Sequence, residues 1–175
     1  MIPRQHLLDS ALAEIERIRF LATKIPQDQL EYRPSEGQRS TLELLQYLSL
    51  CGDSLFASLV VSEEERPALR EKQMAEAKAV TIENFDRAME NQGTRLAEAL
   101  ASVTDERLSE MVTLPWGEAC TLGEAFLNAA IKFLTAYRMQ LFLYLKGMGV
   151  PELSTLQAWL AVDTMEEMEA KFAAS

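Results

Sequence analysis

The first side chain to consider is His6, because histidine is the commonest metal ligand and the usual acid or base near neutral pH. It is the only histidine in the sequence. Zinc sites built on two or three histidines, metal-binding helices with histidines four residues apart, and catalytic histidine pairs all need a second one. These 175 residues therefore exclude such sites, and we interpret His6 as a surface or capping side chain.

Two cysteines are the candidate nucleophiles, and their spacing fits neither a zinc knuckle nor a disulfide framework. Cys51 lies on an apolar helical face without a neighbouring cation that would stabilise thiolate, so we interpret it as a small buried hydrophobe. Cys120 comes one residue before an expected helix N-cap, where the helix dipole favours thiolate. An ordinary loop cysteine remains the simpler interpretation of Cys120.

Carboxylates are abundant, but they gather on charged stretches. A carboxylate metal site in a helical bundle needs acids on the inward-facing stripes, typically as Glu-x-x-His. We assign none there, and in the first helix Glu14, Glu16 and Arg17 are expected to face away from the apolar stripe. Glycines are isolated, so the sequence offers no phosphate-binding loop.

Helices must position these side chains. Apolar residues recur at helical spacing, and no segment shows the sustained period-two alternation of a sheet. The sequence therefore predicts an all-α fold. The expected long helices are a first that ends near Ile25 and Pro26, a second from Ser40 to about Val60, a third capped by Thr81, and a fourth from Thr121 to Gly147 and Gly149.

Local signals set these boundaries. Ser40-Thr41-Leu42-Glu43 and Thr121-Leu122-Gly123-Glu124 both fit the capping box. The charged segment 62–80 suits a solvated helical excursion or a long crossover, and residues 104–120 are expected to form a loop. Long helices with long connections predict a four-helix bundle over residues 1–150. Residues 151–175 predict one amphipathic C-terminal helix that packs on the bundle or on a partner.

Composition limits the partners. There are 27 acidic against 17 basic residues, a formal charge of −10 that disfavours binding to a phosphate backbone. No window approaches the ~20 apolar residues of a membrane span, and the N-terminus lacks the apolar run of a signal peptide. We therefore expect a cytoplasmic protein with no nucleic-acid partner and no membrane association.

Two helices carry recognisable patterns. The fourth contains Thr121-Leu122-Gly123-Glu124-Ala125, Tyr137-Arg138-Met139-Gln140 and Leu141-x-x-x-Leu145-Lys146-x-x-Gly149. The second follows Arg33-Pro34 and Gly37 with Ser40-Thr41-x-Glu43-Leu44-Leu45-Gln46-Tyr47-Leu48. Over roughly residues 3–149 this order resembles the DinB/YfiT-like superfamily. That family shows T-L-x-E, H-x-x-x-H-R-G-Q and L-x-x-x-L-(R/K)-x-x-G in the last helix, and R-P-x-x-G and S-x-x-E-x-x-x-H-L around the second.

The resemblance implies an up-down-down-up bundle, often dimeric, in which many members hold zinc or nickel on three histidines. Some members are thiol-dependent transferases or isomerases, and many are described as metal-dependent hydrolases. At the implied ligand positions this chain has Tyr47, Phe133 and Tyr137. Phenylalanine cannot ligate, and a neutral phenol with a pKa of ~10 is a poor zinc ligand, so we expect no metal and no cofactor. Arg138 and Gln140 keep the family pattern, and we expect them to hold helices together.

Two interpretations of the function stay open. Tyr47, Phe133 and Tyr137, with Cys51 one turn from Tyr47, form either a filled core, which is the simpler interpretation, or a small pocket for an apolar or thiol ligand. We favour a protein that binds a small molecule or a partner without catalysis. Alternatively, the chain is a hydrolase or thiol-dependent transferase that uses Tyr47 and Tyr137 as acids or hydrogen-bond donors.

Assembly is a separate question. A homodimer is compatible with either interpretation. Its interface would use bundle helices or the C-terminal helix, with Trp159 and Phe172 as apolar anchors.

Overall fold

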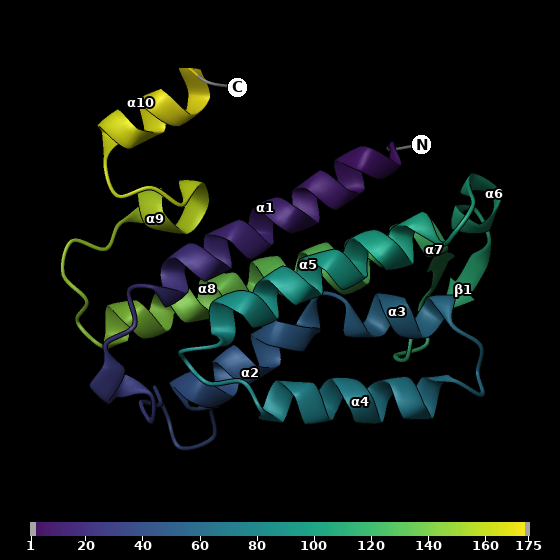
Figure 1. The fold of residues 1–175 in the computed structure, drawn as a ribbon, viewed down its shortest axis with the longest axis horizontal. Helices are drawn as coiled ribbons and strands as arrows, with labels where there is room; N and C mark the ends of the chain where they lie inside the picture. Colours follow the sequence, from purple (N-terminus) through teal and green to yellow (C-terminus); the bar gives the residue numbers. More distant parts are fainter. Residues whose placement is uncertain (1–2, 174–175) are drawn as a thin grey trace.

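A computed structural model of the chain describes residues 3–173. Four long helical segments form a bundle: α1 (Arg4–Ala22), α2 with α3 (Thr41–Cys51 and Ser54–Val60), α5 (Phe85–Ala101), and α7 with α8 (Leu122–Phe126 and Lys132–Gly147). Figure 1 shows the first and fourth segments running in one direction and the second and third in the other. α1 and α2 each contact both α5 and α8. The predicted all-α, up-down-down-up bundle is confirmed.

The interior of the bundle follows the apolar stripes, with one exception. Ile18, Leu44 and Met89 are fully buried, as helical spacing requires. Glu14 is buried as well, so the expectation that it faces away from the stripe was wrong. Its carboxylate accepts a hydrogen bond of 2.7 Å from Nε of Arg138 on α8, and this buried partner makes the inward position tolerable. Within the described residues, no helix has the length and apolar character needed to cross a bilayer.

The N-termini of α2 and α7 match the sequence signals. Ser40 and Thr121 each form a capping box with the glutamate three residues later. The third long helix starts later than predicted, at Phe85, and Thr81 is not its cap. Instead Asn84 holds the preceding turn, because its Oδ1 accepts the backbone N–H of Thr81 at 2.8 Å.

The second segment is broken at Gly52 and Asp53, so the prediction of one helix to Val60 was wrong. The carboxamide of Gln92 on α5 inserts at this break. Its Oε1 accepts the backbone N–H of Gly52 at 2.7 Å, and its Nε2 donates to the carbonyl of Leu48 at 2.9 Å. In a continuous helix these two backbone groups would bond to each other, so one side chain replaces a helical hydrogen bond and the helix breaks.

The crossover between α3 and α5 is helical. α4 (Arg66–Lys78) carries proline in its first turn, where it costs no hydrogen bond. It lies against α2 and α3, and Gln73 and Ala77 are its buried residues. α4 therefore covers the α2–α3 break with little apolar contact.

The segment between α5 and α7 was predicted to be a loop and is partly ordered. It contains α6 (Asp105–Leu108) and an antiparallel hairpin of β1 (Met111–Thr113) and β2 (Ala119–Thr121). Gly117 makes the turn with a φ of +90°, a conformation that glycine adopts without strain. Strands of three residues are too short to show a period-two pattern, which is why the sequence did not reveal them.

Two irregular turns complete the bundle. A short 3₁₀ helix, η1 (Gln27–Gln29), follows α1. A π-helical turn, η2 (Leu127–Ile131), joins α7 to α8 without interrupting the rod. α8 ends at Gly147, and Gly149 follows with a φ of +76°, so the predicted glycine stop is confirmed.

The C-terminal region forms two helices where one was predicted, α9 (Thr155–Leu160) and α10 (Met165–Ala173). The chain breaks at Ala161, which has a left-handed φ of 54°. Arg138 fixes α9 to the bundle, since its Nη1 donates to the carbonyl of Ala158 and its guanidinium lies 4.6 Å from the ring centroid of Trp159.

Candidate functional site

The aromatic residues at the implied ligand positions come together. Tyr47 on α2 and Tyr137 on α8 have ring centroids 4.5 Å apart, and Phe133 stacks on Tyr137 at 6.3 Å. Trp116, in the hairpin turn, lies 6.3 Å from Phe133. We call these four side chains the aromatic wall. Tyr47, Phe133 and Tyr137 are half-buried and Trp116 is exposed, so the wall borders solvent.

Arg39 covers one end of the aromatic wall. Its guanidinium lies 4.1 Å from the ring centroid of Tyr47 and 5.8 Å from that of Tyr137. The Tyr144 hydroxyl holds the backbone of Arg39 by donating to its carbonyl at 2.8 Å, and Nε2 of Gln140 donates to that hydroxyl at 3.1 Å. Gln140 therefore supports the arginine indirectly. Sequence reasoning missed Arg39; its place beside the N-cap of the helix that carries Tyr47 was the available signal.

These residues do not fit a zinc or nickel ion. Burial raises the pKa of Tyr47, and a hydrogen bond with Tyr137 raises it further, so the phenol stays protonated at neutral pH. Phe133 has no donor atom. Among residues 3–173, no group of three or more His, Cys, Asp or Glu side chains could hold a metal. The wall can offer aromatic surface and hydrogen bonds.

Neither cysteine is activated as a nucleophile, although Cys51 lies one helical turn from Tyr47 on α2. Cys51 is buried, with its Sγ 3.7 Å from the Leu48 carbonyl, and burial raises its thiol pKa. Cys120 is also buried, and burial, with Glu118 and Glu124 nearby, raises its pKa. The lowered pKa considered for Cys120 is therefore not supported, which agrees with its simpler interpretation as an ordinary cysteine. His6 is exposed on α1.

A cavity of about 420 Å³ opens beside Tyr47, between α2–α3, α4 and the hairpin turn. We call it the α3–α4 cavity. Its apolar lining comes from Leu50, Leu55, Leu69, Met74 and Pro115. Tyr47 is thus shared between the aromatic wall and this cavity, and a ligand there could contact its ring and hydroxyl.

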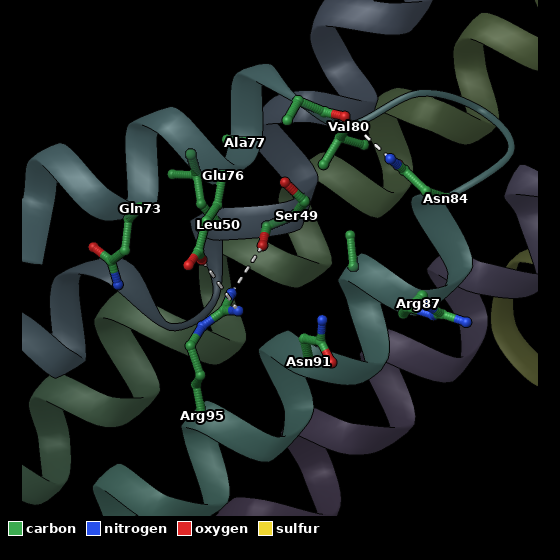
Figure 2. A pocket seen from close by; sticks show the side chains of 12 residues that line it. Ser49, Leu50, Gln73, Glu76, Ala77, Val80, Asn84, Arg87, Asn91 and Arg95 are labelled. Carbon is green, nitrogen blue, oxygen red and sulfur yellow. Dashed lines mark hydrogen bonds and ion pairs between the residues drawn. The ribbon is translucent and has the colours of Figure 1, made fainter.

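A second cavity of about 250 Å³ also has Gln73 in its lining (Figure 2). Arg95 crosses it, donating from Nη2 to the Ser49 carbonyl at 3.3 Å and lying 3.8 Å from Glu76. Its Nε donates to Asp53 at 2.5 Å. Burial raises the pKa of Asp53, and the Arg95 guanidinium opposes that shift. Arg95 is paired with Asp53 and Glu76, which favours a structural role for it, whereas Arg87, also in the lining, has no ion pair among the described residues.

Gln73 lines both cavities, as does Leu50. It is 6% exposed, and its Nε2 has no hydrogen-bond partner within the described part of the chain. An unpaired buried donor costs about 1–3 kcal/mol, so its retention calls for an explanation. Sequence reasoning missed Gln73 because α4 looked solvated, although Leu69, Gln73 and Ala77 form a row four residues apart.

Comparisons with known proteins agree with the fold. Residues 12–131 match the sequence model of the DinB superfamily, a match that includes Tyr47 and ends before Phe133. A DinB-like protein from Bacillus subtilis, YjoA, is 23% identical with a TM-score of 0.63, covering 85% of this chain and 95% of that one. A protein assigned to the DinB family from Exiguobacterium sibiricum is 23% identical with a TM-score of 0.61, covering 86% and 95%. Comparison with curated proteins gave no match.

Proposed function

The chain belongs to the DinB superfamily, and we propose that it binds a small apolar molecule, without metal or catalysis, in the α3–α4 cavity next to the aromatic wall. The observation that carries the proposal is the position of Tyr47, which stands where the resemblance places a metal ligand and instead lines a cavity of about 420 Å³. Small-molecule sites typically have volumes of about 300–1,000 Å³ and mainly apolar walls with a few polar groups.

The titration behaviour supports binding over catalysis. The raised pKa of Tyr47 keeps it a hydrogen-bond donor and not a base, and the raised pKa of Cys51 keeps that thiol out of nucleophilic chemistry. The aromatic wall supplies surface on which an apolar or aromatic ligand can stack. A hydrogen-bond donor and aromatic surface are sufficient for these residues to hold a ligand without catalysis.

Fluorescence of N-phenyl-1-naphthylamine, a neutral apolar probe, tests this proposal. We expect saturable binding of one probe per chain. Leu55→Trp, which fills the cavity, should weaken binding at least about tenfold, a loss of ~1.4 kcal/mol. Leu143→Trp, on the exposed surface of α8, is the matched control and should leave binding unchanged. Absence of saturable binding, or equal binding by both variants, would contradict the proposal.

The metal-free part of the proposal has its own test. Elemental analysis of the purified protein should show no stoichiometric transition metal. One tightly held ion per chain that survives dialysis would contradict it, and the ligands would then have to be found among residues other than the aromatic wall.

We also propose a homodimer that uses the C-terminal helices. Trp159, Met165 and Phe172 are large apolar side chains exposed on α9 and α10, and α10 has no buried residue. Such surface favours association when it is contiguous. Sedimentation equilibrium should give twice the 19.7 kDa chain mass, and Met165→Asp should lower it to one chain. A wild-type monomer at high concentration would contradict the dimer.

A further inference from the structure

The charged residues that line the α3–α4 cavity are basic, whereas the chain as a whole is acidic. The formal charge is −10, yet the lining contains Arg66 and Arg70 and no aspartate or glutamate. Arg66 is held in place because its Nε donates to the Ser58 carbonyl at 2.8 Å. Glu63, 3.6 Å from Arg66, has a side chain 88% exposed and does not line the cavity. Arg70 has no ion-pair partner in the described part of the chain.

Helical spacing brings the polar donors into one row. Arg66, Arg70 and Gln73 lie four and three residues apart on one side of α4 and all line the cavity, with Gln73 buried, Arg66 half-exposed and Arg70 exposed at its mouth. Gln73 ends this row with a buried Nε2 that has no acceptor within residues 3–173. The Gln73 amide lacks an acceptor, and the two guanidinium groups beside it form their strongest hydrogen bonds with anionic oxygens.

Apolar side chains surround these donors. Leu50, Leu55 and Leu69 line the same cavity, which suits a hydrocarbon or aromatic body. We propose that the α3–α4 cavity binds a small amphipathic carboxylate, with its apolar body against the leucines and Tyr47 and its carboxylate held by Arg66, Arg70 and Gln73. This inference rests on the proposed function, because it assigns a ligand class to the same cavity.

Direct calorimetric titrations with octanoate and 1-octanol test the inference, since these probes share one chain length and differ in the head group. We expect octanoate to bind at least about tenfold more tightly, the size of one charge-assisted hydrogen bond. A purely apolar cavity would prefer 1-octanol, because it is the less hydrated of the two. Equal affinities, or tighter binding of 1-octanol, would overturn the inference.

Variants locate the carboxylate. The double variant Arg66→Gln, Arg70→Gln should abolish the preference for octanoate while N-phenyl-1-naphthylamine still binds. The control Lys78→Gln, Arg87→Gln removes the same charge from exposed positions outside this cavity and should keep the preference. Equal loss in both double variants would mean that net charge, and not the row on α4, attracts octanoate, and would overturn the assignment.

Gln73→Leu gives a finer readout. Loss of its amide donor should weaken octanoate binding several-fold and leave 1-octanol binding unchanged. An unchanged octanoate affinity would remove Gln73 from the site. The two proposals fail separately: binding of the neutral naphthylamine probe without a preference for octanoate defeats only the anionic ligand class, whereas no binding of the naphthylamine probe defeats the general apolar site.

Discussion

Two regions of this bundle bury polar side chains, and they do so differently. At the junction of α1, α8 and α9, Arg138 is completely buried and holds Glu14, the Ala158 carbonyl and the Trp159 ring at once. At the α2–α3 break, Gln92 and Arg95 hold the backbone while cavities of about 420 and 250 Å³, both lined by Gln73, remain.

This difference distinguishes a structural contact between helices, at the junction, from a candidate ligand site, at the break. Each region leaves a buried nitrogen unpaired, Nη2 of Arg138 in one and Nε2 of Gln73 in the other. Only Gln73 lies beside a described cavity, where an incoming molecule could supply an acceptor. The buried polar side chains at the junction therefore fix the positions of helices, whereas Gln73 at the break keeps a hydrogen-bond donor available to a ligand. The following predictions test this contrast, beginning with the largest effect.

Arg138→Met should destabilise the fold by about 3–5 kcal/mol, because it removes the fully buried partner of Glu14, whose other carboxylate oxygen then keeps only Arg17, together with the contacts of Arg138 to α9. Urea unfolding followed by circular dichroism measures the change. Adding Glu14→Gln to Arg138→Met removes the buried charge that Arg17 alone would have to balance, and should recover part of the loss. A loss of stability below about 1 kcal/mol in the single variant would mean that the junction does not hold the helices together.

Gly52→Ala should cost about 1–3 kcal/mol, since a Cβ there would lie 2.8 Å from Oε1 of Gln92 and 2.9 Å from Leu134. Gly37→Ala is the matched control, because a Cβ at Gly37 meets nothing within 4 Å. The same urea titration compares them. Equal effects at both glycines would show that the close approach of Gln92 to the break is not required.

Gln73→Leu should change stability in the opposite direction to Arg138→Met. It removes an unsatisfied donor, and we expect a gain of about 1 kcal/mol in the absence of ligand. Thermal unfolding with and without octanoate measures this gain and the accompanying loss of ligand stabilisation. A destabilisation comparable to that of Arg138→Met would place Gln73 with the structural residues.

The smallest effect concerns alkaline pH. The pKa of Tyr47 is raised in the folded protein, so its contribution to stability is complete below the unfolded value of about 10 and is lost as pH rises above it. Tyr47→Phe should therefore reduce the fall in the urea midpoint above pH 10. Cys51→Ala, by the same reasoning, should reduce a fall that begins near pH 8.5. Curves parallel to wild type would contradict both assignments.

Local sequence signals predicted the architecture well. Ser40 and Thr121 mark the starts of their helices through contacts with glutamates three residues away, and the glycine signal that ends α8 is also local in the sequence. The errors depend on distant partners. Glu14 is buried because of a residue 124 positions later, and the α2–α3 break depends on Gln92, 40 positions after Gly52. A helical pattern in one segment contains neither fact.

The candidate site was only partly accessible from the sequence. Resemblance selected Tyr47, Phe133 and Tyr137, and the structure brings their rings together. The resemblance gave no reason to select Arg66, Arg70 or Gln73. These residues are candidates only because they line a cavity where α4 packs beside the break. A cavity is a property of packed surfaces, so periodicity within α4 alone could not reveal it.

The π-helical turn between α7 and α8 has a consequence for the evolution of this surface. Such a turn accommodates one residue more than the α-helix would, and one residue corresponds to about 100° of rotation. Deleting one residue from Leu127–Ile131 would therefore convert the π-helical turn into regular α-helix and leave Phe133 and Tyr137 facing Tyr47. A single-codon deletion at this turn would thus preserve the aromatic wall, whereas the same deletion between Phe133 and Tyr137 would rotate one ring away from the other by about 100°.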